Sequence, residues 1–198
     1  ISACLVGSEM CIRDRCWVAL PKKHEEVDPG FVHVAANALP IIEGEGATAK
    51  IIAGSFFGQR SPVPTLSDLF YVDVQLAPQA RLEVPAEYPE QAIYVVAGQL
   101  DLGRDGVFGP GQLLVLRANT AVTLRNGSNG TTRLMLLGGE PMDGSRYLVW
   151  NFVSSSIERL EQAKEDWRLQ RFAAVPGETE FIPCLLYTSP SPRDRQKS

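Results

Sequence analysis

The stretch Leu69-Phe-Tyr-Val-Asp-Val-Gln-Leu76 carries the clearest secondary-structure signal in the chain. After its first two residues, side chains with a polar group at Tyr71, Asp73 and Gln75 alternate with aliphatic ones at Val72, Val74 and Leu76. Successive side chains of a β-strand point to opposite faces. The alternation therefore predicts a strand with one buried and one solvent-facing side.

Other short strand-like stretches surround this one. They are Phe31–Val34, Ala49–Ala53, Arg81–Val84, Ala92–Val96, Gln99–Leu102, Gln112–Leu116, Ala121–Arg125 and Thr132–Leu137. Glycine, proline and asparagine turns separate them, for example Gly-Arg-Asp-Gly at 103–106. Short strands at this spacing are typical of an antiparallel barrel or a double-sheet sandwich. No helices alternate with them, as they would in a parallel α/β fold.

One helix is predicted near the C-terminal end. Ser155 and Glu158 are spaced as a capping box, in which the serine accepts a hydrogen bond from a first-turn amide. A single apolar stripe follows at helical spacing, formed by Ile157, Leu160, Ala163 and Trp167. Two pairs of opposite charges three residues apart support the same helix, Glu161 with Lys164 and Glu165 with Arg168.

Length and composition are those of a globular protein. The chain has 198 residues, 44% of them hydrophobic and 21% charged, which excludes disordered and collagen-like classes. No apolar run approaches the roughly 20 residues that cross a bilayer. A formal net charge of −4 disfavours a general phosphate-binding surface. We expect a cytoplasmic protein that binds neither nucleic acid nor membrane.

The two ends of the sequence are expected to be foreign to the protein. The stretch 4–14 back-translates to a DNA segment whose reverse complement encodes 184–194, and this segment resembles a transposase-type sequencing adapter. Residues 1–15 and 184–198 therefore say nothing about the fold. Of the four cysteines only Cys16 lies between them, so no intramolecular disulfide is expected. We expect a fragment of a longer protein.

The run from Arg81 to Asn126 resembles the cupin barrel pattern with its metal ligands replaced. Metal-binding cupins carry a His-x-His pair and a Glu before a glycine, which is Gly98 here, and a further His between a second glycine and an Asn, here Gly111 and Asn126. The ligand positions then hold Pro85, Glu87, Gln91 and Val122. A divalent metal in such a barrel needs several imidazoles and a carboxylate. We therefore expect no metal site, with Glu87 a solvated or hydrogen-bonded carboxylate.

Other chemistry is weakly indicated. His24 and His33 are the only histidines. A catalytic metal normally has three protein ligands, so ordinary surface histidines are favoured over a peripheral metal site. The sequence has no Gly-x-Ser-x-Gly elbow and no glycine-rich phosphate loop.

The C-terminal part of the sequence resembles bacterial pirin-family proteins. The resemblance lies in Gly139–Met142, Trp150–Ser156, Glu158–Trp167, Arg171–Phe172 and Pro176–Pro183, and Val18–Glu25 is similar to the connection between that family's two cupin barrels. Pirins are bicupins whose N-terminal barrel carries iron and whose C-terminal barrel is degenerate. The resemblance implies an all-β, cupin-type double-stranded β-helix (a jelly-roll barrel) with flanking β-strands and one C-terminal α-helix.

On this basis the chain divides into six expected segments. They are non-native tails at 1–15 and 184–198, an inter-barrel connection with flanking strands at 16–60, a degenerate cupin barrel at 61–156, a helix at 157–172 and an extended tail at 173–183. Phe181 and Ile182 in the extended tail need a partner surface.

The resemblance implies a metal-free barrel that supports an absent, iron-binding N-terminal barrel of the same protein. The parent protein would resemble an iron-dependent quercetin 2,3-dioxygenase, with no cofactor and no catalytic residue in this fragment. The alternative is a metal-independent module of a redox or transcription co-regulator that binds a small organic ligand or a protein partner. Candidate residues for a pocket inside the barrel are Tyr71, Asp73, Glu87, Tyr94 and Arg117. An interior filled by aliphatic side chains would remove this pocket.

Overall fold

The computed structural model describes residues 16–174, 177 and 179–184. Two compact units are formed. The first, residues 21–145, is called the barrel unit below. The second is called the arm unit, and its described residues are 16–20 together with those from 146 onward.

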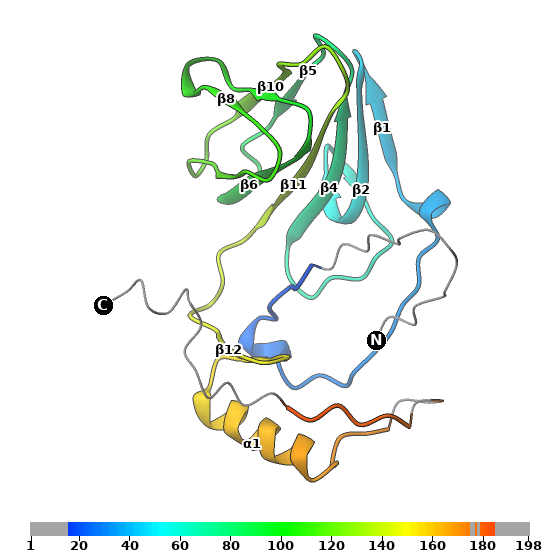
Figure 1. Ribbon diagram of the computed structural model, residues 1–198, viewed down its shortest axis with the longest axis vertical. Helices are drawn as coiled ribbons and strands as arrows, with labels where there is room; N and C mark the ends of the chain where they lie inside the picture. Colours follow the sequence, from blue (N-terminus) through cyan, green and yellow to red (C-terminus); the bar gives the residue numbers. More distant parts are fainter. Residues whose placement is uncertain (1–15, 175–176, 178, 185–198) are drawn as a thin grey trace. The chain divides into compact units, whose positions relative to one another are not determined.

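Two antiparallel sheets make up the barrel unit (Figure 1). The larger has seven strands: β1 (Ile41–Gly44), β2 (Ala47–Phe56), β4 (Leu69–Leu76), β11 (Thr132–Gly139), β6 (Glu90–Ala97) and β9 (Leu113–Val115) in this spatial order, with β3 (Gln59–Arg60) beside β2. The smaller has the order β5 (Arg81–Val84), β10 (Val122–Asn126), β7 (Leu100–Asp101) and β8 (Val107–Phe108). Short 3-10 turns lie at Lys22–His24, Ala36–Ala38 and Gly103–Asp105. The predicted double-sheet, all-β architecture is confirmed.

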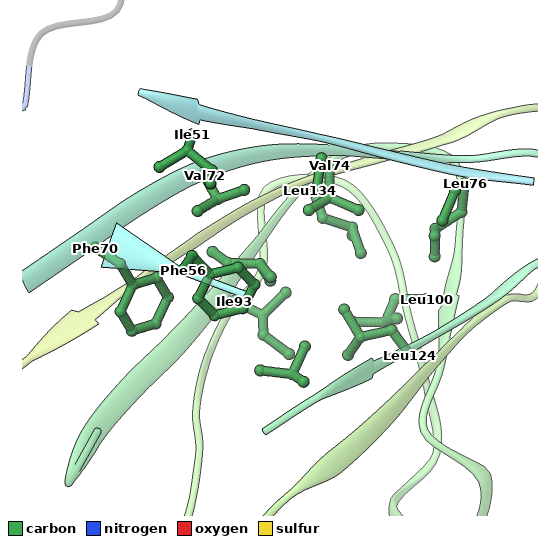
Figure 2. Close-up of a cluster of buried hydrophobic side chains, with 14 of the residues drawn as sticks. Ile51, Phe56, Phe70, Val72, Val74, Leu76, Ile93, Leu100, Leu124 and Leu134 are labelled. Atoms are coloured by element: carbon green, nitrogen blue, oxygen red, sulfur yellow. The ribbon is translucent and has the colours of Figure 1, made fainter. Parts of the chain in front are cut away.

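The hydrophobic core is formed by one face of each strand. Val72, Val74 and Leu76 are completely buried, whereas Tyr71, Asp73 and Gln75 lie on the other side of β4, as the alternation predicts. Figure 2 shows these aliphatic side chains pointing toward others of the core, including Ile51, Phe56, Phe70, Ile93, Leu100, Leu124 and Leu134. Burying each such side chain contributes roughly 1.5–3 kcal/mol, so this cluster supplies much of the driving force for folding.

Gly98 follows β6 at a point where no other residue fits. Its φ of +78° is in the left-handed region that favours glycine. A Cβ at this position would also collide with the side chain of Thr132. The Thr132 hydroxyl lies between two acceptors, the Gln99 carbonyl at 3.0 Å and the Asn126 Oδ1 at 2.7 Å, which share its one proton. The glycine of the cupin pattern is thus retained for backbone geometry.

The prediction of a strand at Phe31–Val34 is wrong. Residues 31–35 form no strand, and Phe31 and Val32 are exposed. The edge of the larger sheet beside β2 is already taken by β1, which pairs Ile41 with Lys50 and Gly44 with Ala47. Residues 31–34 therefore do not occupy the place beside β2, and they pair with no other strand of the described chain.

The arm unit contains a hairpin and a helix. Strands β12 (Tyr147–Val149) and β13 (Phe152–Ser154) pair antiparallel, and α1 (Ile157–Arg168) follows directly. The predicted helix cap is displaced by one residue, because Ser156, and not Ser155, is the extended residue whose hydroxyl accepts from the Arg159 amide at 3.2 Å. The same hydroxyl donates to Glu158 at 2.7 Å, and this hydrogen bond lowers the pKa of the Glu158 carboxyl.

The predicted helix pairs are confirmed. Lys164 lies 2.7 Å from Glu161 and Arg168 lies 2.6 Å from Glu165. Because these pairs are exposed to solvent, which screens their charges, each contributes little to stability. No helix in the part of the chain that the structure describes is long and apolar enough to cross a membrane.

The buried face of β11 should dominate the stability of the barrel unit. Leu134→Ala is expected to lower the free energy of unfolding by roughly 2–5 kcal/mol, because it leaves a cavity between the two sheets. Leu113→Ala is the matched control, since Leu113 is exposed, and should cost less than about 0.5 kcal/mol. Urea unfolding followed by circular dichroism measures both. Equal losses would contradict this account of the core.

Candidate functional site

The four positions of the cupin ligand pattern lie on β6, on β10 and in the 85–89 loop before β6. Gln91 is 6% exposed, and its Nε2 donates to the carbonyls of Pro85 at 2.9 Å and Tyr88 at 3.2 Å. Its Oε1 is buried and has no hydrogen-bond partner among the described residues. Gln91 therefore ties the loop to β6 through its amide group.

The remaining ligand positions do not complete a metal site. Glu87 is exposed, Pro85 is half-buried, and Val122 packs against the core. Together with Gln91 they offer one solvent-facing carboxylate and one amide whose nitrogen is already engaged. No group of three His, Cys, Asp or Glu side chains within the described ranges could hold a metal ion. The donor set does not fit an iron centre of the kind that the family resemblance implies for the N-terminal barrel of a bicupin.

Tyr88 holds the other side of the same loop. The single proton of its hydroxyl is shared between the Ser55 carbonyl at 3.1 Å and an Asp68 carboxylate oxygen at 3.3 Å. Its ring lies 4.9 Å from that of Phe70, which in turn stacks on Phe56 at 4.9 Å. Burial, assisted by the nearby Asp68 carboxylate, raises the pKa of Tyr88 to about 12. The loop is thus fastened by an amide and a phenol.

Asn126, the last residue of the cupin pattern, has a structural role. Its Nδ2 donates to the carbonyls of Leu76 at 2.9 Å and Gly130 at 2.7 Å. Its Oδ1 accepts from the Ser128 amide at 2.8 Å and the Thr132 hydroxyl at 2.7 Å. This buried side chain joins the ends of β4 and β10 to the turn between β10 and β11.

The predicted pocket residues do not gather inside the barrel, whose described interior is filled by the hydrophobic core. Tyr71, Asp73 and Tyr94 lie on strand faces opposite the core. Glu87 and Arg117 are exposed in loops. None of these five residues is part of the wall of either of two surface cavities, one in the barrel unit and one in the arm unit. The expectation of an interior pocket formed by these residues is therefore corrected: they are surface residues of the barrel unit.

Two of them, Asp73 and Tyr94, lie on either side of Met135 on what we call the outer face of the larger sheet, the side away from the core. Met135 on β11 pairs with Asp73 on one side and with Tyr94 on the other. Arg133 donates two hydrogen bonds to Asp73, at 2.8 and 3.0 Å. Sequence reasoning missed Met135 and Arg133, although their alternation with Leu134 and Leu136 could have placed them on this face.

The outer face ends in an apolar edge. Leu113 on β9 pairs with Tyr94, and Val115 pairs with Ala92. Leu113 is 57% and Val115 81% exposed, while Tyr94 is 39% exposed. Exposed apolar side chains grouped at a sheet edge are a feature of surfaces that contact another protein. It offers no arrangement for covalent or acid–base catalysis.

A groove of about 580 Å³ lies at one end of the barrel unit. Its charged lining residues are Lys23, Arg60, Asp68, Glu140 and Asp143. Asp68 is the residue that accepts from Tyr88, and Asp143 accepts from the Lys22 amide at 2.9 Å. Charges of both signs line this groove, which no motif in the sequence indicated.

Comparison with known proteins agrees with this structure. Residues 71–173 match the family described as the Pirin C-terminal cupin domain. A pirin-like protein of Caulobacter vibrioides is 44% identical over 178 residues, covering 85% of this chain and 58% of that protein. Human pirin is 26% identical over 156 residues, covering 77% of this chain and 54% of its own length.

The fold has a solved counterpart as well. A crystal structure of quercetin 2,3-dioxygenase from Acinetobacter baumannii superposes with a TM-score of 0.73 and 26% identity, covering 88% of this chain and 59% of that one. The chain therefore spans a little over half the length of the relatives described here.

Replacing the Gln91 amide by a carboxyl should make stability depend on pH. In Gln91→Glu the introduced carboxylate faces two carbonyl oxygens, so burial and repulsion raise its pKa above the usual value of about 4.3. Below about pH 4.3 the variant should be nearly as stable as the wild type, because its protonated carboxyl can donate a hydrogen bond. As the pH rises toward neutrality, its free energy of unfolding should fall by about 1–3 kcal/mol. Gln91→Leu is the control and should show a loss independent of pH. Superimposable pH profiles of the two variants would contradict the amide clamp.

The raised pKa of Tyr88 predicts a loss of stability at alkaline pH. The unfolded phenol titrates near pH 10 and the folded one near 12, so the stabilisation is complete below about pH 10 and declines as the pH rises through that window. The free energy of unfolding should be measured between about pH 9 and about pH 11, because the ordinary tyrosine pKa is about 10. Over this range it should fall more steeply for the wild type than for Tyr88→Phe. Tyr94→Phe, at an exposed tyrosine, should behave as the wild type.

Proposed function

The chain belongs to the pirin family, and on that premise we propose that it is a metal-free C-terminal cupin barrel that supports an iron-binding N-terminal barrel of the same protein. The observation that carries this proposal is the set of residues at the cupin ligand positions, above all Gln91. Its amide holds the loop that would otherwise present imidazoles. The barrel frame is thus maintained by protein groups alone, and its role is structural.

Catalysis is assigned to the rest of the parent protein. The Acinetobacter baumannii relative is a quercetin 2,3-dioxygenase. We propose the same class of reaction for the parent, with iron and all reacting groups in the N-terminal barrel. Two features of this chain support that division, the engaged amide of Gln91 and the filled barrel interior. This chain would contribute packing and shape near the entrance of the other barrel.

The arm unit is the proposed contact with the N-terminal barrel. In its hairpin, Val149 and Phe152 share one face with Ser154, which is buried, while Leu148 pairs with Val153 on the other face. Leu148 is 61% and Val153 37% exposed. A two-stranded hairpin is marginally stable unless its apolar faces are covered. The face of Leu148 and Val153 therefore suits a second protein surface.

Residues at the start of the described chain belong to the same unit. The Arg146 side chain donates to the carbonyl of Leu20, from Nη2 at 2.8 Å and from Nε at 3.2 Å. Trp17 and Val18 precede Leu20 and are more than half exposed. These exposed apolar side chains add to the surface that an N-terminal barrel would cover.

The test measures the iron content and the quercetin turnover of this chain, and its binding to an N-terminal part of a relative. The purified 198-residue chain should contain no stoichiometric iron and consume no quercetin. The N-terminal part of the Caulobacter vibrioides relative, co-produced with an affinity tag, should capture this chain. Stoichiometric iron or turnover in the chain alone would overturn the proposal.

A matched pair of variants locates the contact. Leu148→Asp should reduce capture by roughly tenfold or more, because it places a charge in an apolar interface. Val107→Asp, at an exposed valine of the barrel unit, should leave capture unchanged. Val115→Asp tests the alternative that the outer face of the larger sheet binds the partner. Loss with Val115→Asp but not with Leu148→Asp would transfer the contact to that face.

A further inference from the structure

The end of β10 and the turn that follows it hold the two Asn-Gly pairs of the sequence, Asn126-Gly127 and Asn129-Gly130. An asparagine that precedes glycine is prone to spontaneous deamidation, because glycine has no side chain to shield its amide nitrogen. That nitrogen attacks the side-chain carbonyl carbon of the asparagine. The two pairs share this chemistry, so a difference in their reactivity must come from the structure around each of them.

Asn126 is restrained at both of its reacting groups. It is 9% exposed, and its Nδ2 donates to the carbonyls of Leu76 at 2.9 Å and Gly130 at 2.7 Å. The amide of Gly127, which would attack, donates to the Gln99 carbonyl at 2.9 Å. The reaction at Asn126 therefore has to break hydrogen bonds of the folded state first. Such a local opening costs free energy and protects the residue.

Asn129 has none of these restraints. It is exposed, and its side chain forms no hydrogen bond with the described part of the chain. The Gly130 amide likewise donates to no group among the residues that the structure describes. A Cβ added to Gly130 would meet no atom within 4 Å, so the surroundings of this glycine are open. Attack at Asn129 breaks no interaction of the described structure.

The reaction balances with water as its only co-reactant. The Gly130 nitrogen forms a bond to Cγ of Asn129, and the side-chain amino group leaves as ammonia with the proton that the glycine nitrogen gives up. Water then opens the resulting succinimide. Cleavage of the bond between Cγ and the glycine nitrogen gives aspartate. Cleavage of the bond between the backbone carbonyl carbon and that nitrogen gives isoaspartate, whose main chain runs through the β-carbon.

We propose that Asn129 is a site of spontaneous deamidation in the folded protein, and that its isoaspartate product weakens the hydrogen bond from Asn126 to the turn. That bond ends on the Gly130 carbonyl. Isoaspartate inserts one additional main-chain atom directly before Gly130, which displaces this carbonyl from Asn126. Aspartate leaves the length of the main chain unchanged. The site lies in the barrel unit and does not depend on the contact proposed above for the arm unit.

The test follows both asparagines in one peptide. The purified 198-residue chain is kept at mildly alkaline pH in heavy-oxygen water, so that each deamidation of the folded protein incorporates a heavy oxygen atom. Digestion in ordinary water with trypsin, which cuts after Arg125 and Arg133, then releases the peptide 126–133. Tandem mass spectrometry locates the label in it. Asn129 should be converted roughly tenfold or more faster than Asn126.

The same chain unfolded in urea is the control for effects of the sequence alone. Both Asn-Gly pairs then lack tertiary structure, so their deamidation rates should be similar. Equal rates at Asn126 and Asn129 in the folded chain would overturn the proposal. The same preference for Asn129 in the folded and the unfolded chain would also overturn it, because the structure would then have no part in the selection.

Gly130→Ala is the matched variant. Its Cβ meets no neighbouring atom, and the φ of Gly130 lies outside the left-handed region, so the fold should be retained. The methyl group shields the attacking nitrogen, and deamidation at Asn129 should slow many-fold while the rate at Asn126 stays the same. An unchanged rate at Asn129 in this variant would contradict the proposed attack by the Gly130 amide.

Urea unfolding separates the two products. Asn129→Asp reproduces the aspartate product and should unfold at the same urea concentration as the wild type. The deamidated fraction of an aged wild-type sample, isolated by its added negative charge and shown to contain isoaspartate by comparison with synthetic peptides, should unfold at a lower urea concentration. Equal midpoints for this fraction and Asn129→Asp would refute the weakening of the turn.

Discussion

Strand β11 lies between β4 and β6, and its hydrogen-bond register constrains the rest of the barrel unit. The register places Leu134 and Leu136 in the core and Arg133 and Met135 on the outer face. Because side chains alternate with a period of two, a slip of one residue would expose the core and bury the ion pair. The two-sheet core and the exposed surface thus depend on one ladder.

Side-chain hydrogen bonds hold the cupin frame together around the positions where metal-binding cupins carry their ligands. Gln91 and Tyr88 fasten the loop between β5 and β6 from two sides. Asn126, the last residue of the cupin pattern, joins the ends of β4 and β10. A buried amide can do this because it donates to carbonyls and carries no charge that would need compensation. Gln91 and Asn126 therefore each have a structural role within the cupin pattern.

Part of this organisation was predictable from the sequence, and particular residues show where prediction stopped. The faces of β4 and the pairs along α1 follow from local periodicity, which a sequence displays directly. The helix cap was placed one residue early because adjacent serines offer the same hydroxyl, and only the backbone angles of Ser156 distinguish them. The interior pocket was wrong because the alternation of Tyr71 and Asp73 says that they share a face without saying what covers it.

The sequence by itself determined the strand periodicity, the absence of histidines from the cupin ligand positions and the family to which the chain belongs. Only the tertiary structure decided which distant side chains meet, such as Asp73 with Arg133 and Trp167 with Phe181. The physical reason is that these contacts depend on strand register and on the path of the chain after α1. Both are set by hydrogen bonds and packing between segments far apart in sequence, which no local pattern encodes.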